Sequence, residues 1–214
     1  MKAKIKAKHL VISLCALIVT ICSIYFLKSP QQERLSQTEI SELRDEYPIC
    51  GVEVPPNISM RTLSLEEVKQ HVDTFVYGEV VGDIHTYDKK ISTGYSELDE
   101  KEKSKGLSNI YHFYEYTITV IDDTEGKYSK GEKITIADNT DFISYNPQLK
   151  DGMKIVVPVQ KDEKVDGRHG YFVQGMYYVT DEGYAISAYD ESASKVTRSL
   201  SGVKVSQLLK QLKK

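Results

Sequence analysis

The 214-residue sequence has no tryptophan, only three cysteines and only six prolines. This composition excludes a collagen-like chain, a coiled coil and a disulfide-rich mini-protein. Cys15 and Cys22 fall within one apolar run, so Cys50 is the only cysteine in the rest of the chain and cannot form an intramolecular disulfide there. No base is close to Cys50 in the sequence. We interpret it as a structural cysteine, with a disulfide between chains or a nucleophilic role as the alternatives.

Sequence motifs for catalysis and for cofactor binding are also missing. The chain has no G-x-S-x-G, H-E-x-x-H or C-x-x-C motif, and its acidic clusters lack the EF-hand spacing. No glycine-rich loop opens a helix to hold a phosphate. The sequence therefore predicts no catalytic residue, no metal ligand and no cofactor. The alternative is an extracytoplasmic hydrolase with an unfamiliar site, for which Asp138, Asp141 and His169 are the candidate residues.

The one long hydrophobic run lies at the N-terminus, where Leu10 to Leu27 contain no charged side chain. As a helix these 18 residues would extend about 27 Å, which is close to the thickness of a bilayer core. Four basic residues precede the run: Lys2, Lys4, Lys6 and Lys8. They predict a cytoplasmic stub at 1–8, a transmembrane helix at 9–28 that contacts lipid through 9–27, and an outer C-terminal part. Cleavage as a signal peptide is the alternative, but no A-x-A-like site ends the run.

Charge is unevenly divided by this segment. Four of the 28 basic residues precede it, which leaves 24 against all 31 acidic residues and a formal charge of −7 from Lys28 onward. An acidic outer domain is unsuited to polyanion binding, and its location separates it from nucleic acid. We therefore expect no nucleic-acid partner.

The outer part divides into a linker, a domain and a closing helix. Ser64 and Glu67 form a capping box that begins a short helix over 65–73. The expected divisions are a stalk or linker at 29–63, a domain at 64–202 with a polar insertion at 87–109, and an amphipathic C-terminal helix at 203–214.

Alternating apolar and polar residues predict five or six strands in the domain. The expected strands cover 74–84, 111–122, 132–137, 154–160, 171–180 and 184–189. Gly78 and Gly82 indicate a bulge or bend in the first, and Pro158 indicates an edge or bulged position in the fourth. Turns separate the strands without crossover helices. The fold class is therefore mainly β, a small antiparallel OB-like or Greek-key barrel with short flanking helices, in addition to the transmembrane helix.

Three stretches resemble a known class of domains: Asp73–Val81 (DTFVYGEVV), Lys127–Ile136 (KYSKGEKITI) and Leu149–Val157 (LKDGMKIVV). Their order is similar to that in membrane-anchored or secreted β-barrel domains of Gram-positive bacteria. More remotely, residues 64 to 180 resemble netrin-like (TIMP-like) OB-fold modules. Because the paired cysteines of those modules are missing here, the resemblance implies a fold and no inhibitory activity.

Tyrosine is abundant, with 15 residues against five phenylalanines. His112, Tyr114 and Tyr116 share one face of a strand, and Tyr177 and Tyr178 lie on a later one. An apolar ring with a polar hydroxyl suits a binding surface, and packing in a small core is the alternative. Together with the membrane segment, these residues predict a non-enzymatic, membrane-anchored extracytoplasmic module that binds a protein or cell-wall partner. A structural factor that acts through its transmembrane helix is a third hypothesis.

Overall fold

A computed structural model describes eight segments of the chain: 34–51, 62–90, 95–106, 110–143, 145–161, 167–171, 173–189 and 199–214. The helix predicted at 9–28 lies outside these segments and stays a prediction. Among the helices that the structure does describe, none is both long enough and apolar enough to span a bilayer.

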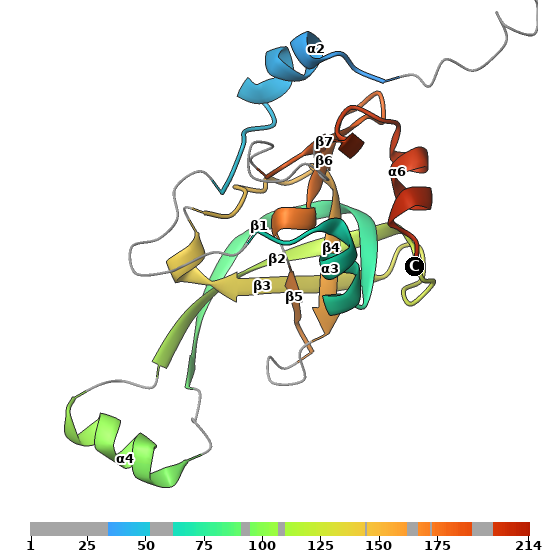
Figure 1. Cartoon of the computed structure of the whole chain (residues 1–214). Helices are drawn as coiled ribbons and strands as arrows, with labels where there is room; N and C mark the ends of the chain where they lie inside the picture. Colours follow the sequence, from blue (N-terminus) through green and yellow to red (C-terminus); the bar gives the residue numbers. More distant parts are fainter. Residues whose placement is uncertain are drawn as a thin grey trace, which may run out of the picture. The chain divides into compact units, whose positions relative to one another are not determined.

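The described residues contain short helices and seven strands, joined by turns and loops (Figure 1). The helical elements are α2 (Gln37–Glu42), η1 (Leu43–Asp45), α3 (Leu65–His71), α4 (Ser96–Ser104), η2 (Thr140–Phe142), η4 (Val173–Gly175) and α6 (Val205–Leu212). The strands are β1 (Thr74–Lys90), β2 (Ile110–Asp123), β3 (Lys133–Asn139), β4 (Lys154–Lys161), β5 (His169–Tyr171), β6 (Tyr177–Val179) and β7 (Ala185–Ser187). The prediction of a mainly β fold with short helices is confirmed, as is the capping box of α3.

The strands form one mixed sheet, and part of it closes into a ring. The order is β1-β2-β3-β5-β4-β6-β7, and an additional pairing of β1 with β4 joins the first five strands. All pairs are antiparallel except β3 and β5, which run parallel and meet at Ile136 and His169. The expectation of a purely antiparallel sheet is therefore wrong, because β3 and β5 run in the same direction where they meet.

Glycines bend β1 at two places, as the sequence predicted. The register with β2 shifts between Tyr77 and Gly78, and again between Val81 and His85. Gly82 lies in the second shift with φ +77°, a left-handed conformation that glycine adopts without strain. These shifts curve β1, so that its first part pairs with β4 while its last part leaves the ring.

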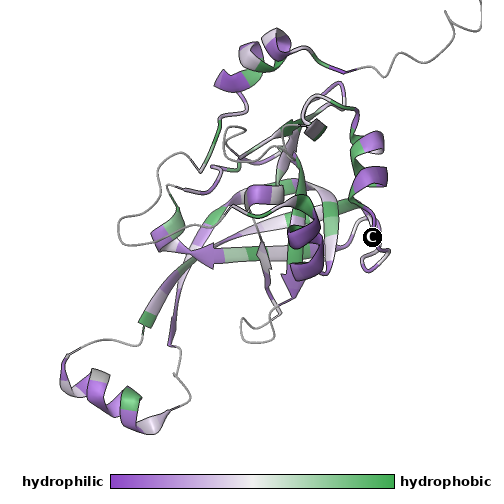
Figure 2. Cartoon of the chain, in the orientation of Figure 1, coloured by the Kyte–Doolittle hydropathy of each residue, from purple (hydrophilic) through white to green (hydrophobic). Residues whose placement is uncertain are grey.

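Two hydrophobic layers stabilise the domain, and β4 contributes to both. Ile155, Val157 and Val159 point into the ring, whereas Val156 packs in a second cluster with residues of α3 and α6. Such alternation is what a strand covered on both faces requires. In Figure 2, α4 is by contrast largely hydrophilic.

Pro158 explains why the strand expected over 171–180 is broken in two. β4 has β1 on one side and both β5 and β6 on the other, so of the two positions expected for Pro158, an edge or a bulge, the edge is excluded. On the second side the pairing stops after Val156 and resumes at Val159. A proline has no N–H for the ladder, and η4 separates β5 from β6 at this interruption.

Residues 34–51, here called the strap, belong to the folded domain and not to a stalk. The strap lies in one compact unit with the rest of 34–214. The Leu35 N–H donates to the Gly202 carbonyl at 2.9 Å, and the Cys50 N–H donates to the Ala188 carbonyl at 2.9 Å. Ile40 and Tyr47 are 3% and 7% exposed. The predicted boundary at residue 64 is therefore corrected to residue 34.

β1 and β2 continue past the ring as a paired extension. We call this extension the arm; it comprises Asp83–Lys90 of β1, Ile110–Glu115 of β2 and the described connecting residues 95–106, which include α4 (Figure 1). The predicted polar insertion began at residue 87, but the first four of its residues are strand. Tyr87 to Lys90 pair in register with Ile110 to Phe113.

Candidate functional site

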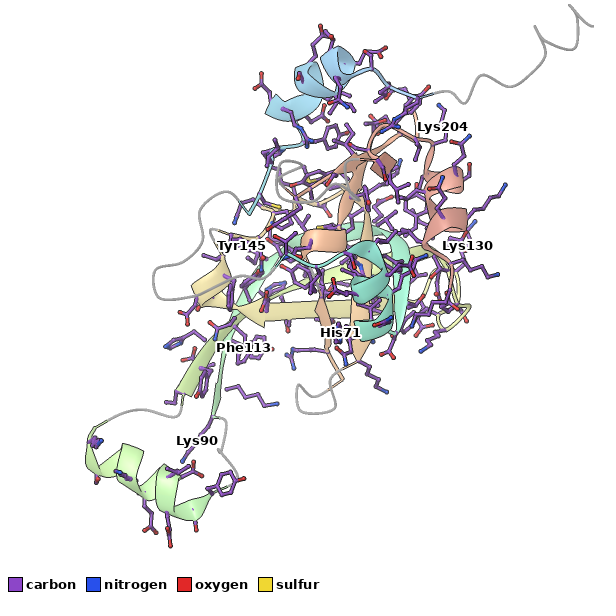
Figure 3. All side chains as sticks on the ribbon, in the orientation of Figure 1. His71, Lys90, Phe113, Lys130, Tyr145 and Lys204 are labelled. Atoms are coloured by element: carbon purple, nitrogen blue, oxygen red, sulfur yellow. The ribbon has the colours of Figure 1, made fainter. Side chains whose placement is uncertain are left out.

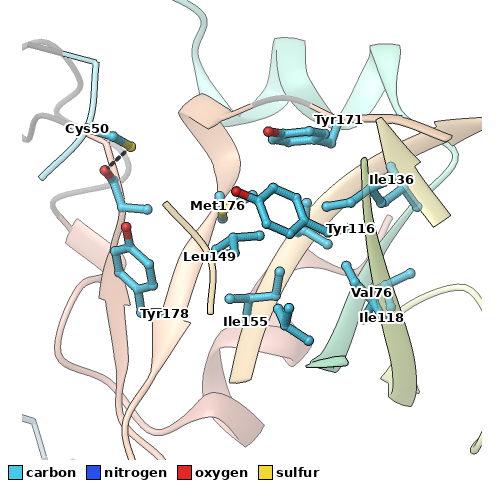
Figure 4. Packing of buried hydrophobic residues seen from close by; sticks show 14 of the residues in the cluster. Cys50, Val76, Tyr116, Ile118, Ile136, Leu149, Ile155, Tyr171, Met176 and Tyr178 are labelled. Atoms are coloured by element: carbon cyan, nitrogen blue, oxygen red, sulfur yellow. Dashed lines mark hydrogen bonds between the residues drawn. The ribbon is translucent and has the colours of Figure 1, made fainter. Parts of the chain in front are cut away.

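The tyrosines predicted to form a binding face lie in the interior. Tyr114 and Tyr116 are each 1% exposed, and Tyr177 and Tyr178 are fully buried. Tyr177 belongs to the cluster that includes residues of α3 and α6, whereas Tyr178 belongs to the other cluster, where it lies near Cys50 (Figure 4) and 5.6 Å from the ring of Tyr47. The structure therefore does not bring them together on one surface, and it favours the core-packing alternative. Of the five predicted residues only His112 is exposed, and its Nδ1 lies 2.6 Å from an Asp88 carboxylate oxygen on β1.

Two interior tyrosines, Tyr114 and Tyr171, belong to one hydrogen-bonded network. The hydroxyls of Tyr114 and Tyr171 lie 2.7 Å apart, and Asn146 Nδ2 donates both to the Tyr114 hydroxyl and to Asp138 Oδ2. Burial raises the pKa of Tyr114, since a phenolate is poorly solvated inside the ring. The phenols are therefore neutral at physiological pH and serve to satisfy one another.

Three residues named for a hydrolase occupy separate networks. His169 is 6% exposed, with Nε2 2.7 Å from the Tyr128 hydroxyl and Nδ1 3.2 Å from the Thr135 carbonyl oxygen. Asp138 accepts its hydrogen bonds from Asn146 and from the Asn139 N–H. Asp141 is exposed on η2. None of these contacts pairs a nucleophile with a base.

A surface cavity of about 360 Å³ also lacks the groups of a nucleophilic site. Its lining contains no histidine, serine or cysteine and consists of Glu46, Tyr47, Lys150, Asp151, Gly152, Met153, Lys154, Val179 and Asp181. Across the described segments, no three side chains among His, Cys, Asp and Glu are grouped closely enough to hold a metal ion.

Cys50 is held as a neutral thiol in the interior. It is 8% exposed, and its Sγ–H donates to the Ala188 carbonyl oxygen (Figure 4). Burial raises its pKa to about 12. The thiolate is the nucleophile, so this environment suppresses reactivity and supports a structural role.

Alkylation tests this assignment of Cys50. Because the pKa rises from 9.0 to about 12, we expect alkylation at pH 8 to be about a thousandfold slower in the folded than in the unfolded chain. Peptide mass spectrometry of the full chain separates the Cys50 product from those of Cys15 and Cys22. Equal rates with and without denaturant would contradict a buried thiol.

Exposed apolar side chains gather on the arm. Five large hydrophobic residues of the described chain are prominently exposed, and four of them belong to the arm: Tyr95 at 69%, Leu98 at 48%, Ile110 at 46% and Tyr111 at 42%. Ile49 of the strap is the fifth, at 42%. Single exposed apolar groups are ordinary, but their concentration in one part of the described chain makes the arm the candidate interaction surface.

A second group of residues lies at the base of the arm. The rings of Tyr87 and Phe113, opposite each other on β1 and β2, stack at 5.4 Å between centroids with 16° between their planes. The Arg168 guanidinium lies 4.2 Å from the centroid of the Tyr87 ring and forms an ion pair with Glu115. In Figure 3, Phe113 and Lys90 lie along the arm, between the ring and α4.

The sequence left open which face of β2 is buried. His112, Tyr114 and Tyr116 alternate with Tyr111, Phe113 and Glu115, and both sets contain aromatic residues. The alternation alone does not tell which set is inside. In the structure Tyr114 and Tyr116 face the ring interior, whereas His112, which lies farther out on the arm, is exposed.

Comparison with known proteins identifies no relative: no protein-family model matches the chain, and no curated protein is significantly similar to it.

Proposed function

We propose that this protein is a membrane-anchored extracytoplasmic binding module that contacts a protein or cell-wall partner through the arm. The concentration of exposed apolar side chains on the arm carries the proposal. Aromatic and apolar side chains surrounded by polar ones are the usual anchors of a protein interface. Residues 9–27 would hold the module in the membrane, with the −7 charged part outside and nucleic acid excluded as a partner.

The barrel type is part of the same proposal. Ring order β1-β2-β3-β5-β4 with one parallel contact supports an OB-like, Greek-key arrangement. The likeness of three motifs to anchored or secreted domains of Gram-positive bacteria, and remotely to netrin-like modules, supports the same assignment. A hydrolase receives no such support, because its candidate residues lie in separate networks.

Crosslinking in intact cells tests the arm as the contact surface. We expect the double substitution Leu98→Ser and Tyr111→Ser to lower crosslinking of the full-length chain to its partner about tenfold, since apolar anchors dominate interface energies. Both side chains are exposed, so the unfolding free energy is expected to change by no more than about 0.5 kcal/mol. The crosslinked species are identified by mass spectrometry.

Ile49→Ser is the matched control, because Ile49 has the same 42% exposure as Tyr111 but lies on the strap. It should leave crosslinking unchanged. Equal yields from the double variant and the native chain would exclude the arm. An equal loss of crosslinking in both variants would show that the effect is not specific to the arm.

A further inference from the structure

The arm joins the ring at a bend in β1. Between the pairs Val81–Thr117 and His85–Glu115, three residues of β1 face a single residue of β2. Such a bulge weakens the ladder and increases the local twist. The positive φ of Gly82 lies within the bulge, and a Cβ there would meet no atom within 4 Å. The backbone at this junction is therefore neither continuously paired nor sterically packed at Gly82.

Two contacts cross this junction from the ring side. The Gly82 N–H donates to Asp151 Oδ1 at 2.6 Å, which ties the bend to the turn before β4. Arg168 lies immediately before β5, whose first residue, His169, pairs with β3 at the closure of the ring. From there Arg168 reaches both strands of the arm, pairing with Glu115 of β2 and covering the ring of Tyr87 on β1.

Arg168 is well suited to hold two strands at once. A guanidinium is planar, so it can donate in its plane to a carboxylate while an aromatic ring lies against its face. The ion pair is partly buried, with side-chain exposures of 26% and 20%. Partial burial weakens solvent screening, so this pair is stronger than an exposed one. Stacking of Tyr87 on Phe113 extends the contact across both strands.

We infer that Arg168 is a positioning residue, which clamps the arm at its glycine hinge and so presets the direction of the proposed contact surface. The inference rests on the proposed function for the purpose of the clamp, but the clamp itself is measurable without any partner. Holding the arm in one direction lowers the entropy lost when a partner binds. Release of the clamp would leave the ring folded and the arm mobile.

Hydrogen–deuterium exchange of the full-length chain tests the clamp. We expect Arg168→Ala to speed amide exchange in peptides covering 83–90 and 110–115 about tenfold, the effect of losing one partly buried ion pair and one cation–π contact. Peptides from the ring strands β3 and β4 should exchange at native rates. Lys127→Ala is the matched control, because it removes the ion pair of Lys127 with Asp73 at 3.3 Å, away from the arm.

A charge reversal separates clamping from general support of the fold. Arg168→Glu alone should accelerate exchange in the arm at least as much as Arg168→Ala, because the new carboxylate would face the carboxylate of Glu115 and repel it. Adding Glu115→Arg restores an ion pair and should return much of the protection. Unchanged arm exchange in Arg168→Ala, or equal acceleration throughout the ring, would overturn the inference. If exchange confirms the clamp but the arm variants crosslink normally, the proposed function is excluded and the clamp is not.

Discussion

Gly78→Ala is expected to destabilise the domain by about 3 kcal/mol, a large part of the 5–15 kcal/mol that usually stabilises a domain. A Cβ at this position would lie 2.3 Å from Cγ2 of Ile118 and 2.8 Å from the Thr119 carbonyl oxygen. Ile118 is fully buried in the ring, and the carbonyl belongs to the β2 backbone, so neither atom can easily move away. Urea denaturation followed by circular dichroism measures the loss.

Gly170→Ala provides the control for this substitution. There the added Cβ would meet only the Gln160 carbonyl oxygen, at 3.9 Å, an ordinary contact. Its effect should stay within about 1 kcal/mol, the range of a glycine-to-alanine change without a clash. Similar losses in the two variants would show that close packing at Gly78 is not the cause.

Asp123→Ala is expected to cost about 2–4 kcal/mol at pH 7, because it removes a carboxylate that accepts several hydrogen bonds. Oδ1 accepts from the Thr74 hydroxyl and from the Glu125 N–H at 2.9 Å, and Oδ2 accepts from the Tyr128 N–H at 2.8 Å. These bonds hold the β2–β3 turn to the start of β1. Urea denaturation at several pH values measures the difference from the native chain.

Acidification should shrink this difference. Burial alone would raise the pKa of Asp123, but the hydrogen bonds from Thr74, Glu125 and Tyr128 outweigh it and lower the pKa. A lowered pKa in the folded state adds stability above the unfolded value of about 3.9 and loses it as the pH falls through the folded value. The native chain and the variant should therefore converge below about pH 4. A difference that stays constant with pH would contradict the role of the charge.

Asp138→Asn is the contrasting control. Burial raises the pKa of Asp138, despite hydrogen bonds from Asn139 and Asn146. Its contribution is then complete below the unfolded pKa and is lost as the pH rises through the folded value, opposite to Asp123. We expect Asp138→Asn to be at least as stable as the native chain at pH 7. A loss as large as that of Asp123→Ala would show that Asp138 stabilises the fold as a carboxylate.

How much of the fold followed from the sequence depends on whether the deciding contact was local. The capping box of Ser64 and Glu67 involves residues three apart, so the start of α3 was predicted correctly. Glycines at 78 and 82 indicated bends that exist. The strap was missed, because Leu35 and Cys50 find their backbone partners at Gly202 and Ala188, well over a hundred residues away.

The candidate site depended on distant contacts even more strongly. No local pattern connects Arg168 with Tyr87 or Glu115, since these residues meet only when β5 closes the ring against β3. The composition shows that tyrosine is abundant, but it does not tell which tyrosine side chains are buried and which are exposed. Tyr114 is buried, whereas Tyr111, three residues earlier on the same strand, is exposed. The place of a tyrosine in the sheet, and not the residue type, therefore decides whether it packs in the core or faces solvent.

The strap determines how the domain would respond to mechanical force applied through its N-terminal side. A pull transmitted along the chain arrives first at Arg34 and Leu35, which are held by a bridge to Val203 and by hydrogen bonds to the carbonyls of Ser201 and Gly202. These contacts are few, whereas the strands of the ring are joined along long paired stretches. The strap would therefore peel away before the ring opens, and its loss would bring Cys50 into solvent.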